Sequence, residues 1–210
     1  MTTAQEKFWQ SDFGDDYIAR NTAEPAALDQ IYFQRYGLSR SAMNQEFLAD
    51  LKIRNILEVG CNIGNQLALL KNQGYADLTG LEINYEAATV AQKRLPQAKI
   101  IEGSAFALPF SDNQFDLVFT SGVLIHIHPD DLKTMMSEMV RVTKKYLWGF
   151  EYYAPQMTTI EYRGHRDRLW KNNFAEVYQT FFPKLKLLKE KQYPYQDRSG
   201  NIDSMFLLSK

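Results

Sequence analysis

The chain has 210 residues, of which 45% are hydrophobic and 23% are charged, and its formal net charge is −1. These values are ordinary for one globular domain, and the near-neutral charge argues against general attraction to nucleic acid or to an anionic membrane. The single cysteine, Cys61, excludes an intramolecular disulfide and suits a reducing compartment. The first residues show no signal-peptide pattern, and no apolar stretch approaches the roughly 20 residues that span a bilayer. We therefore expect a cytoplasmic protein.

The first fifty residues have a helical, aromatic-rich pattern. Phe8, Trp9, Phe13 and Tyr17 recur at helical spacing, and Pro25 suits the first turn of a further helix. We expect residues 1–50 to form a helical lid that excludes water from a site. The alternative is plain packing of these helices against the rest of the fold. The remaining residues, 51–210, are expected to form the core.

From residue 55 onward, short apolar segments alternate with helical ones. The expected strands lie at 55–60, 77–82, 98–102, 114–120 and 145–151, and the expected helices at about 64–73, 85–95 and 130–142. This alternation predicts βαβ units and a parallel sheet with helices on both faces. A helix at about 169–181 and two strands, 185–191 and 204–209, follow; with no helix between them, those strands must pair antiparallel. The predicted fold is α/β, a Rossmann-like doubly wound sheet, mostly parallel with a C-terminal antiparallel hairpin.

The most informative segment is the glycine turn after the first expected strand. Ile56, Leu57 and Val59 form a buried apolar strand, and Gly60 and Gly64 bracket a turn that permits close approach of a ligand. The second glycine comes one residue too early for the final glycine of the dinucleotide fingerprint Gly-x-Gly-x-x-Gly. A nicotinamide-dependent oxidoreductase is therefore disfavoured, although it stays an alternative beside a non-catalytic nucleotide-binding protein.

Further candidate residues follow the other strands, where ligands bind in open α/β sheets. Glu82 ends the second strand 22 residues after Gly60, where a carboxylate can accept hydrogen bonds from ribose hydroxyls. The loop 103–106, Gly-Ser-Ala-Phe, can address the edge and face of a purine, or it is an ordinary loop.

These segments together resemble class I S-adenosylmethionine-dependent methyltransferases, from about residue 50 to the end of the chain. Glu58-Val-Gly60-Cys-Asn62-Ile-Gly64 resembles the first motif of that family, and Glu82 matches the acidic residue of the second. The segment 113–119, Asn-Gln-Phe-Asp-Leu-Val-Phe, matches the fourth-strand motif. The resemblance implies S-adenosylmethionine as cofactor and S-adenosylhomocysteine as its product. The cofactor-binding residues that it implies are Glu58, Gly60, Asn62, Gly64, Glu82, Ile83, Ser104, Ala105, Phe106 and Ser121.

Two residues depart from the family pattern. Asn62 replaces the central glycine of the first motif, and asparagine tolerates the left-handed conformation better than most residues. Ser104 stands where an aspartate often precedes the adenine, and it brings a hydroxyl without a charge.

A narrower resemblance covers nearly the whole chain. The segments 13–21, 122–129, 151–153 and 162–165 are similar to the pseudaminic acid biosynthesis-associated methylases, small bacterial enzymes named for their genomic setting. This resemblance implies a sugar or nonulosonic-acid-related acceptor for methyl transfer to oxygen or nitrogen. The alternative acceptor is a cationic amine or guanidine, held by Glu151 and neighbouring tyrosines through charge and cation–π contact.

The expected acceptor residues follow the fourth and fifth strands. His126, Glu151 and Tyr153 are the catalytic candidates, with His126 as base or orienting group. The expected substrate-binding residues are Tyr17, Asn21, His126, Glu151, Tyr152, Tyr153, Tyr162, Arg163 and His165. Two of these residues have a structural alternative: His126 can brace a loop, and Arg163 can pair with Glu151. We expect no metal, a small-molecule acceptor, no nucleic-acid or membrane partner, and a monomer or homodimer.

Overall fold

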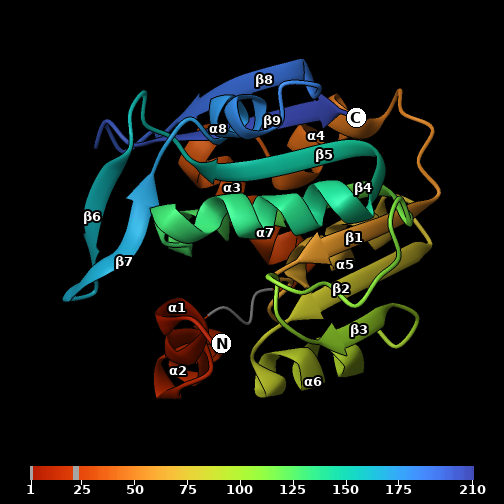
Figure 1. Ribbon diagram of the computed structural model, residues 1–210, viewed down its shortest axis with the longest axis horizontal. Helices are drawn as coiled ribbons and strands as arrows, with labels where there is room; N and C mark the ends of the chain where they lie inside the picture. Colours follow the sequence, from red (N-terminus) through yellow and green to blue (C-terminus); the bar gives the residue numbers. More distant parts are fainter. Residues whose placement is uncertain (1, 21–23) are drawn as a thin grey trace. The chain divides into compact units, whose positions relative to one another are not determined.

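The computed structural model describes residues 2–20 and 24–210, and the chain divides into two compact units, residues 1–105 and 106–210 (Figure 1). The predicted substrate residue Asn21 lies outside the described residues. Among the described residues, no helix combines the length and the apolar character needed to cross a bilayer.

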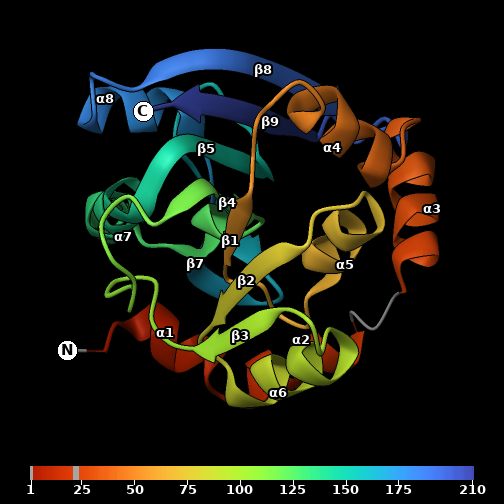
Figure 2. The same cartoon turned by 90° about the vertical axis from the view of Figure 1, so that its right-hand side faces the viewer.

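Within its described residues, the first unit combines six helices with a parallel three-stranded segment. Its helices are α1 (Ala4–Trp9), α2 (Asp12–Arg20), α3 (Pro25–Tyr36), α4 (Arg40–Leu48), α5 (Asn65–Asn72) and α6 (Tyr85–Arg94), and its strands are β1 (Asn55–Val59), β2 (Asp77–Glu82) and β3 (Lys99–Glu102). The strands run in the order β3-β2-β1, with Asn55 opposite Asp77 and Thr79 opposite Lys99. Figure 2 shows α3 and α4 beside α5, and α2 beside α6.

The local sequence explains where these elements begin. Ile56, Leu57 and Val59 of β1 are fully buried, as expected of a strand covered on both faces. Gly64 is the N-cap residue of α5. Asn84 is the N-cap residue of α6, and its side chain accepts a hydrogen bond from the Ala87 amide. The carboxyl ends of β1 and β2 therefore each lead through a short turn into a helix, and the second of these helices has a side-chain cap.

The second unit contains the rest of the sheet and a separate hairpin. Its elements are β4 (Phe115–Ser121), the 3₁₀ turn η1 (Leu124–His126), α7 (Pro129–Val142), β5 (Thr143–Tyr152), β6 (Thr158–Tyr162), β7 (His165–Lys171), α8 (Phe174–Phe181), β8 (Lys186–Pro194) and β9 (Ile202–Ser209). Strand β4 is parallel to β5, whereas β9 is antiparallel to both β5 and β8. Helix α7 packs against β4 and β5 (Figure 1), and the side chains that it buries are Leu132, Met135, Met136, Met139 and Val142.

The strand order of the seven-stranded sheet is β3-β2-β1-β4-β5-β9-β8. The sheet is mostly parallel with an antiparallel C-terminal strand, which confirms the predicted fold class. The strands predicted from the sequence agree with the observed ones to within two or three residues at each end.

The segment 158–171 differs from the prediction. A helix was expected from about residue 169, but Leu169 and Trp170 are buried in strand β7, and α8 begins only at Phe174. Strands β6 and β7 form a two-stranded antiparallel hairpin in which Tyr162 is opposite His165. Arg163 and Gly164, at φ 51° and 80°, form its two-residue turn. Two left-handed residues are what a type I′ hairpin turn requires, so Arg-Gly between two strand-like segments was the overlooked signal.

Candidate functional site

The glycine turn after β1 is built from three residues in the left-handed conformation. Gly60, Asn62 and Gly64 have φ angles of 75°, 47° and 79°. The amides of Gly60 and Cys61 both donate to the Leu81 carbonyl, at 2.8 and 3.0 Å, which ties the turn to β2. The Asn62 side chain accepts a hydrogen bond from the Ile63 amide at 2.8 Å. Asparagine thus satisfies the turn geometry and one of its amides, which accounts for its place where the family pattern has glycine.

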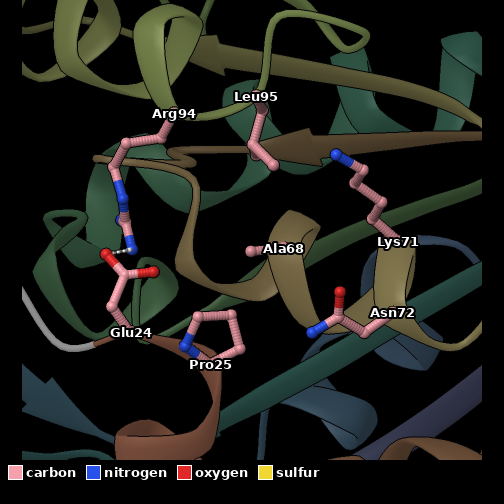
Figure 3. Close-up of a pocket in the computed structure, with 7 residues that line it drawn as sticks. All are labelled: Glu24, Pro25, Ala68, Lys71, Asn72, Arg94 and Leu95. Carbon is pink, nitrogen blue, oxygen red and sulfur yellow. Dashed lines mark hydrogen bonds and ion pairs between the residues drawn. The ribbon is translucent and has the colours of Figure 1, made fainter.

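The back of this turn is braced by the end of α6. The Arg94 guanidinium donates to the Ile63 carbonyl at 2.9 Å and to Asn65 Oδ1 at 2.7 Å. It also pairs with Glu24 at 3.3 Å, at the start of α3 (Figure 3). A Cβ on Gly64 would lie 2.8 Å from a Leu95 methyl carbon, so only glycine fits there without rearrangement. Sequence reasoning missed Arg94, because an arginine in the last turn of a helix ordinarily favours the helix dipole and nothing more.

Glu24, Arg94 and Leu95 also line a pocket of about 330 Å³ in the first unit (Figure 3). Its lining residues are Glu24, Pro25, Ala68, Lys71, Asn72, Arg94 and Leu95. None of the predicted site residues lines it, so this pocket is separate from the face of the turn that the sequence assigns to a ligand.

Glu82 is joined directly to the glycine turn. Its Oε2 accepts from the Asn62 amide at 2.7 Å, and its Oε1 accepts from the amides of Ile83 and Asn84, both at 2.9 Å. Burial raises the pKa of this carboxyl, while the three amide hydrogen bonds act in the opposite direction. A carboxylate has about four lone-pair positions, so one on Oε2 stays available. The structure therefore brings Asn62, Glu82 and Ile83 together, with room for one further donor.

Glu58, on β1, is a buried carboxylate. Its Oε2 has no hydrogen-bond partner, and burial raises its pKa well above the usual range. The nearby charge of Arg40 opposes this shift. Arg40 is itself fully buried in α4 and donates to Asn44 Oδ1 at 2.8 Å. Sequence reasoning did not anticipate Arg40, since a cation in a polar helix gives no sign that it is buried.

The loop after β3 is held from two sides. The Gly103 amide donates to the Glu82 carbonyl at 2.8 Å, and the Ser104 hydroxyl donates to Glu6 Oε1 of helix α1 at 2.5 Å. Ala105, which ends the first unit, and Phe106, which begins the second, are half-buried. The N-terminal segment that the sequence assigns to a lid thus contacts the loop assigned to the purine.

The N-terminal aromatic residues form one cluster. The Trp9 ring lies 5.6 Å from Phe13 and 5.3 Å from the predicted substrate residue Tyr17, both edge to face. The Trp9 carbonyl accepts a hydrogen bond from Asn84 Nδ2 at 3.1 Å, just after Glu82. Helices α1 and α2 are therefore attached to the end of β2 as well as to the loop after β3.

In the second unit, Glu151 supports the turn that carries His126. Its Oε1 accepts from the Val123 amide at 3.2 Å and its Oε2 from the Ile125 amide at 3.4 Å. Only 1% of its surface is exposed, and burial raises its pKa to about 7. Arg163 lies exposed in the hairpin turn and forms no ion pair with Glu151. The suggested Arg163–Glu151 brace is therefore wrong, and Glu151 holds the 3₁₀ turn η1 instead.

His126 is buried in η1 and is fixed by the hairpin. Its Nδ1 lies 2.8 Å from the Arg168 carbonyl of β7, and burial lowers its pKa to about 4. The imidazole is therefore neutral at pH 7, and because a carbonyl only accepts hydrogen bonds, Nδ1 carries the proton. The other nitrogen, Nε2, then carries the ring's basic lone pair. The Tyr162 ring lies 5.1 Å away.

The remaining predicted acceptor residues are more dispersed. Tyr152 ends β5 and Tyr153 follows it, both half-buried, and the Tyr153 amide donates to the Ile202 carbonyl at 2.9 Å. His165 is exposed at the start of β7, and Ser121 is half-buried at the end of β4. The structure thus brings His126 and Tyr162 together, whereas Arg163 and His165 lie at the exposed end of the hairpin.

Comparison with known proteins gives a domain-level match. Residues 57–146 match the family model described as a methyltransferase domain, which is less than half of the chain. An uncharacterized methyltransferase of Synechocystis is 34% identical over 91 residues, covering 43% of this chain and 42% of that protein. The aligned segment spans only 36% to 42% of the length of the first curated relatives.

Solved structures match at low identity, and some of them cover 99% of this chain. The 1,6-didemethyltoxoflavin-N1-methyltransferase of Burkholderia thailandensis matches with a TM-score of 0.72 and 16% identity, covering 99% of this chain and 91% of that one. The cyclase SpnF matches with a TM-score of 0.70 and 13% identity, covering 99% of this chain and 96% of that one. Similarity at this level demonstrates a shared fold.

The domain match identifies a methyltransferase domain at residues 57–146, and the shared fold supports the predicted class, a class I S-adenosylmethionine-dependent methyltransferase domain, with S-adenosylmethionine as its cofactor. The narrower resemblance to the pseudaminic acid-associated methylases stays a prediction.

Proposed function

We propose that the whole protein transfers a methyl group from S-adenosylmethionine to an oxygen or nitrogen atom of a small-molecule acceptor in a biosynthetic pathway. The observation that carries this proposal is the link between the glycine turn and Glu82. The Asn62 amide and Glu82 Oε2 are 2.7 Å apart, inside the segment that matches a methyltransferase domain.

The residues of the first unit fit this cofactor. The available lone pair on Glu82 suits a ribose hydroxyl, and the left-handed turn at Gly60 and Gly64 permits close approach of the ligand to the backbone. Burial raises the pKa of the Cys61 thiol well above its usual value, so this cysteine stays protonated and is not a competing nucleophile.

His126 is our candidate for the base. When bound, the sulfonium supplies an electrophilic methyl group and a thioether leaving group. Nε2 of His126 would accept the proton from the acceptor hydroxyl or amine as the new bond to the methyl carbon forms. The Arg168 carbonyl keeps Nδ1 protonated and so keeps this lone pair on Nε2. Glu151 is a positioning residue in this scheme, because its oxygens contact the η1 backbone.

The acceptor class is proposed from resemblance. A sugar or nonulosonic-acid-related acceptor agrees with the narrower family, and one structural neighbour carries a small molecule, 1,6-didemethyltoxoflavin, in its solved complex. The alternative cationic acceptor loses its main support, because Glu151 is buried and committed to backbone amides. We also retain as proposals the lid role of residues 1–50 with the core at 51–210, a cytoplasmic location and a monomer or homodimer.

Calorimetry with S-adenosylhomocysteine and with NAD tests the proposal. We expect tight binding of S-adenosylhomocysteine and no binding of NAD. In a separate turnover assay, S-adenosylmethionine is supplied with a panel of sugar, amine and heteroaromatic acceptors, and we expect S-adenosylhomocysteine to form as product with one of them. Binding of NAD alone would support the oxidoreductase alternative. Binding of S-adenosylhomocysteine without turnover on any acceptor would favour the non-catalytic alternative.

A further inference from the structure

The carboxylate of Glu6 lies in a place that the predicted site does not explain. Glu6 belongs to the six-residue helix α1, yet its side chain leaves 9% of its surface exposed and reaches the loop after β3. Its Oε1 accepts the Ser104 hydroxyl proton, and its Oε2 accepts the Thr3 amide at 2.7 Å. A buried carboxylate from a distant part of the sequence is thus attached to the loop that we assign to the purine.

Two independent attachments fix Glu6 in this place. The Thr3 hydroxyl accepts from the Glu6 amide at 3.1 Å, which completes a capping box and sets the rotamer of Glu6. At the other end of α1, the Trp9 carbonyl accepts from Asn84 Nδ2. Gly14 permits the close turn into α2, since a Cβ there would lie 2.1 Å from the Trp9 carbonyl oxygen.

An adenosine ligand has hydrogen-bond donors on its ribose and on its adenine, and the first unit has two carboxylates, Glu82 and Glu6, that could accept from them. Glu82 has one lone-pair position left, which a ribose hydroxyl can occupy. The adenine amino group has two N–H donors and also needs an acceptor. The Ser104 hydroxyl is oriented by donating its proton to Glu6 and brings a neutral oxygen to this loop, whereas Glu6 brings a carboxylate, the stronger acceptor. Each carboxylate oxygen of Glu6 accepts one hydrogen bond, so about half of its lone-pair positions stay available.

We propose that Glu6 of α1 reads the 6-amino group of the adenine, so that the N-terminal helix, rather than the loop after β3, supplies the acceptor that selects adenine. This inference rests on the proposed function, because it requires an adenosine-containing ligand. It makes α1 a specificity element of the cofactor site in addition to a cover.

The test compares S-adenosylhomocysteine with S-inosylhomocysteine, in which a 6-oxo group replaces the 6-amino group. The wild type should prefer the amino compound by about 10- to 100-fold, the value of one hydrogen bond to a charged group. In Glu6→Gln, the side-chain amide can accept from an amino group or donate to a carbonyl, so this preference should fall by at least about tenfold. Binding is measured by calorimetry on the full-length protein.

Two control variants separate recognition from helix packing. Thr3→Ala removes the capping hydroxyl but keeps the Glu6 carboxylate, so it should weaken both ligands equally and leave their ratio unchanged. Glu86→Gln removes an exposed carboxylate in α6 and should change neither the affinity for the two ligands nor their ratio.

The outcomes distinguish this inference from the function on which it rests. An unchanged ratio in Glu6→Gln, or complete loss of both ligands, overturns the inference and makes Glu6 a structural residue while the function stands. If the wild type itself binds neither compound, the proposed cofactor site fails first.

Discussion

Replacing Glu151 by glutamine should change how the free energy of unfolding depends on pH. Burial raises the pKa of Glu151 from 4.5 to about 7 in the native state. Between these values the native state binds more protons than the unfolded state, so this group lowers the free energy of unfolding as pH rises. The loss amounts to about 3 kcal/mol, since one pKa unit corresponds to about 1.4 kcal/mol.

His126 should produce a change of similar size and opposite sign. Burial lowers its pKa from 6.5 to about 4, so between these values the unfolded state binds more protons. The free energy of unfolding therefore rises by about 3 kcal/mol between pH 4 and pH 6.5. In the wild type the contributions of Glu151 and His126 to the free energy of unfolding largely cancel between pH 4.5 and 6.5. Replacing one of these residues should leave the pH dependence of the other visible.

Urea unfolding from pH 4.5 to 7.5, followed by tryptophan fluorescence, measures this effect. Relative to wild type, Glu151→Gln should gain about 3 kcal/mol across the window, and His126→Asn should lose about 3 kcal/mol. Comparing each variant with wild type cancels the titration of all other groups. Profiles that stay parallel to wild type, with folded spectra for both variants, would refute the assigned burial of the two groups.

Three further results are expected. Glu82→Ala should weaken S-adenosylhomocysteine binding by about 10- to 100-fold in calorimetry through loss of a charged acceptor, and an unchanged dissociation constant would remove Glu82 from the site. Gly64→Ala should lower the thermal midpoint more than Gly74→Ala by the equivalent of about 1–3 kcal/mol, because both have positive φ but only the first meets Leu95; equal shifts would contradict the packing argument. His126→Ala should reduce kcat by about 10²- to 10⁴-fold while cofactor affinity stays within a few-fold, and full activity would make His126 structural.

The sheet could be predicted from the sequence because its pattern is local. Buried runs such as Ile56–Val59 end in glycine or in helix caps, and those signals fix both the type and the end of each element. Both strands of the hairpin 158–171 were missed. At the second one, Leu169 and Trp170 are adjacent apolar residues, which suit a helix as well as a strand buried on both faces. Only tertiary contact decides between the two.

The candidate site was predictable where chemistry lies next to a strand end. Glu82 and the glycine turn are found from spacing alone, because parallel strands bring their carboxyl ends to one edge. Glu6, Arg40 and Arg94 were not found, since their partners are distant in the sequence: Glu6 acts across 98 positions, Arg94 across 31 and Arg40 across 18. Glu151 was predicted as a ligand contact from its acidity, and the structure adds that its oxygens accept from the η1 amides; its role toward a substrate stays a prediction.

The β6–β7 hairpin gives His126 a second use, as a reporter group. A two-stranded sheet is marginally stable by itself, and this one supplies the carbonyl that holds the imidazole. When the hairpin opens, water reaches His126 and its pKa returns toward 6.5, so protonation and opening favour each other below that pH. The ring proton shifts of His126 in an NMR titration would therefore measure how often the hairpin detaches, without any label on the hairpin itself.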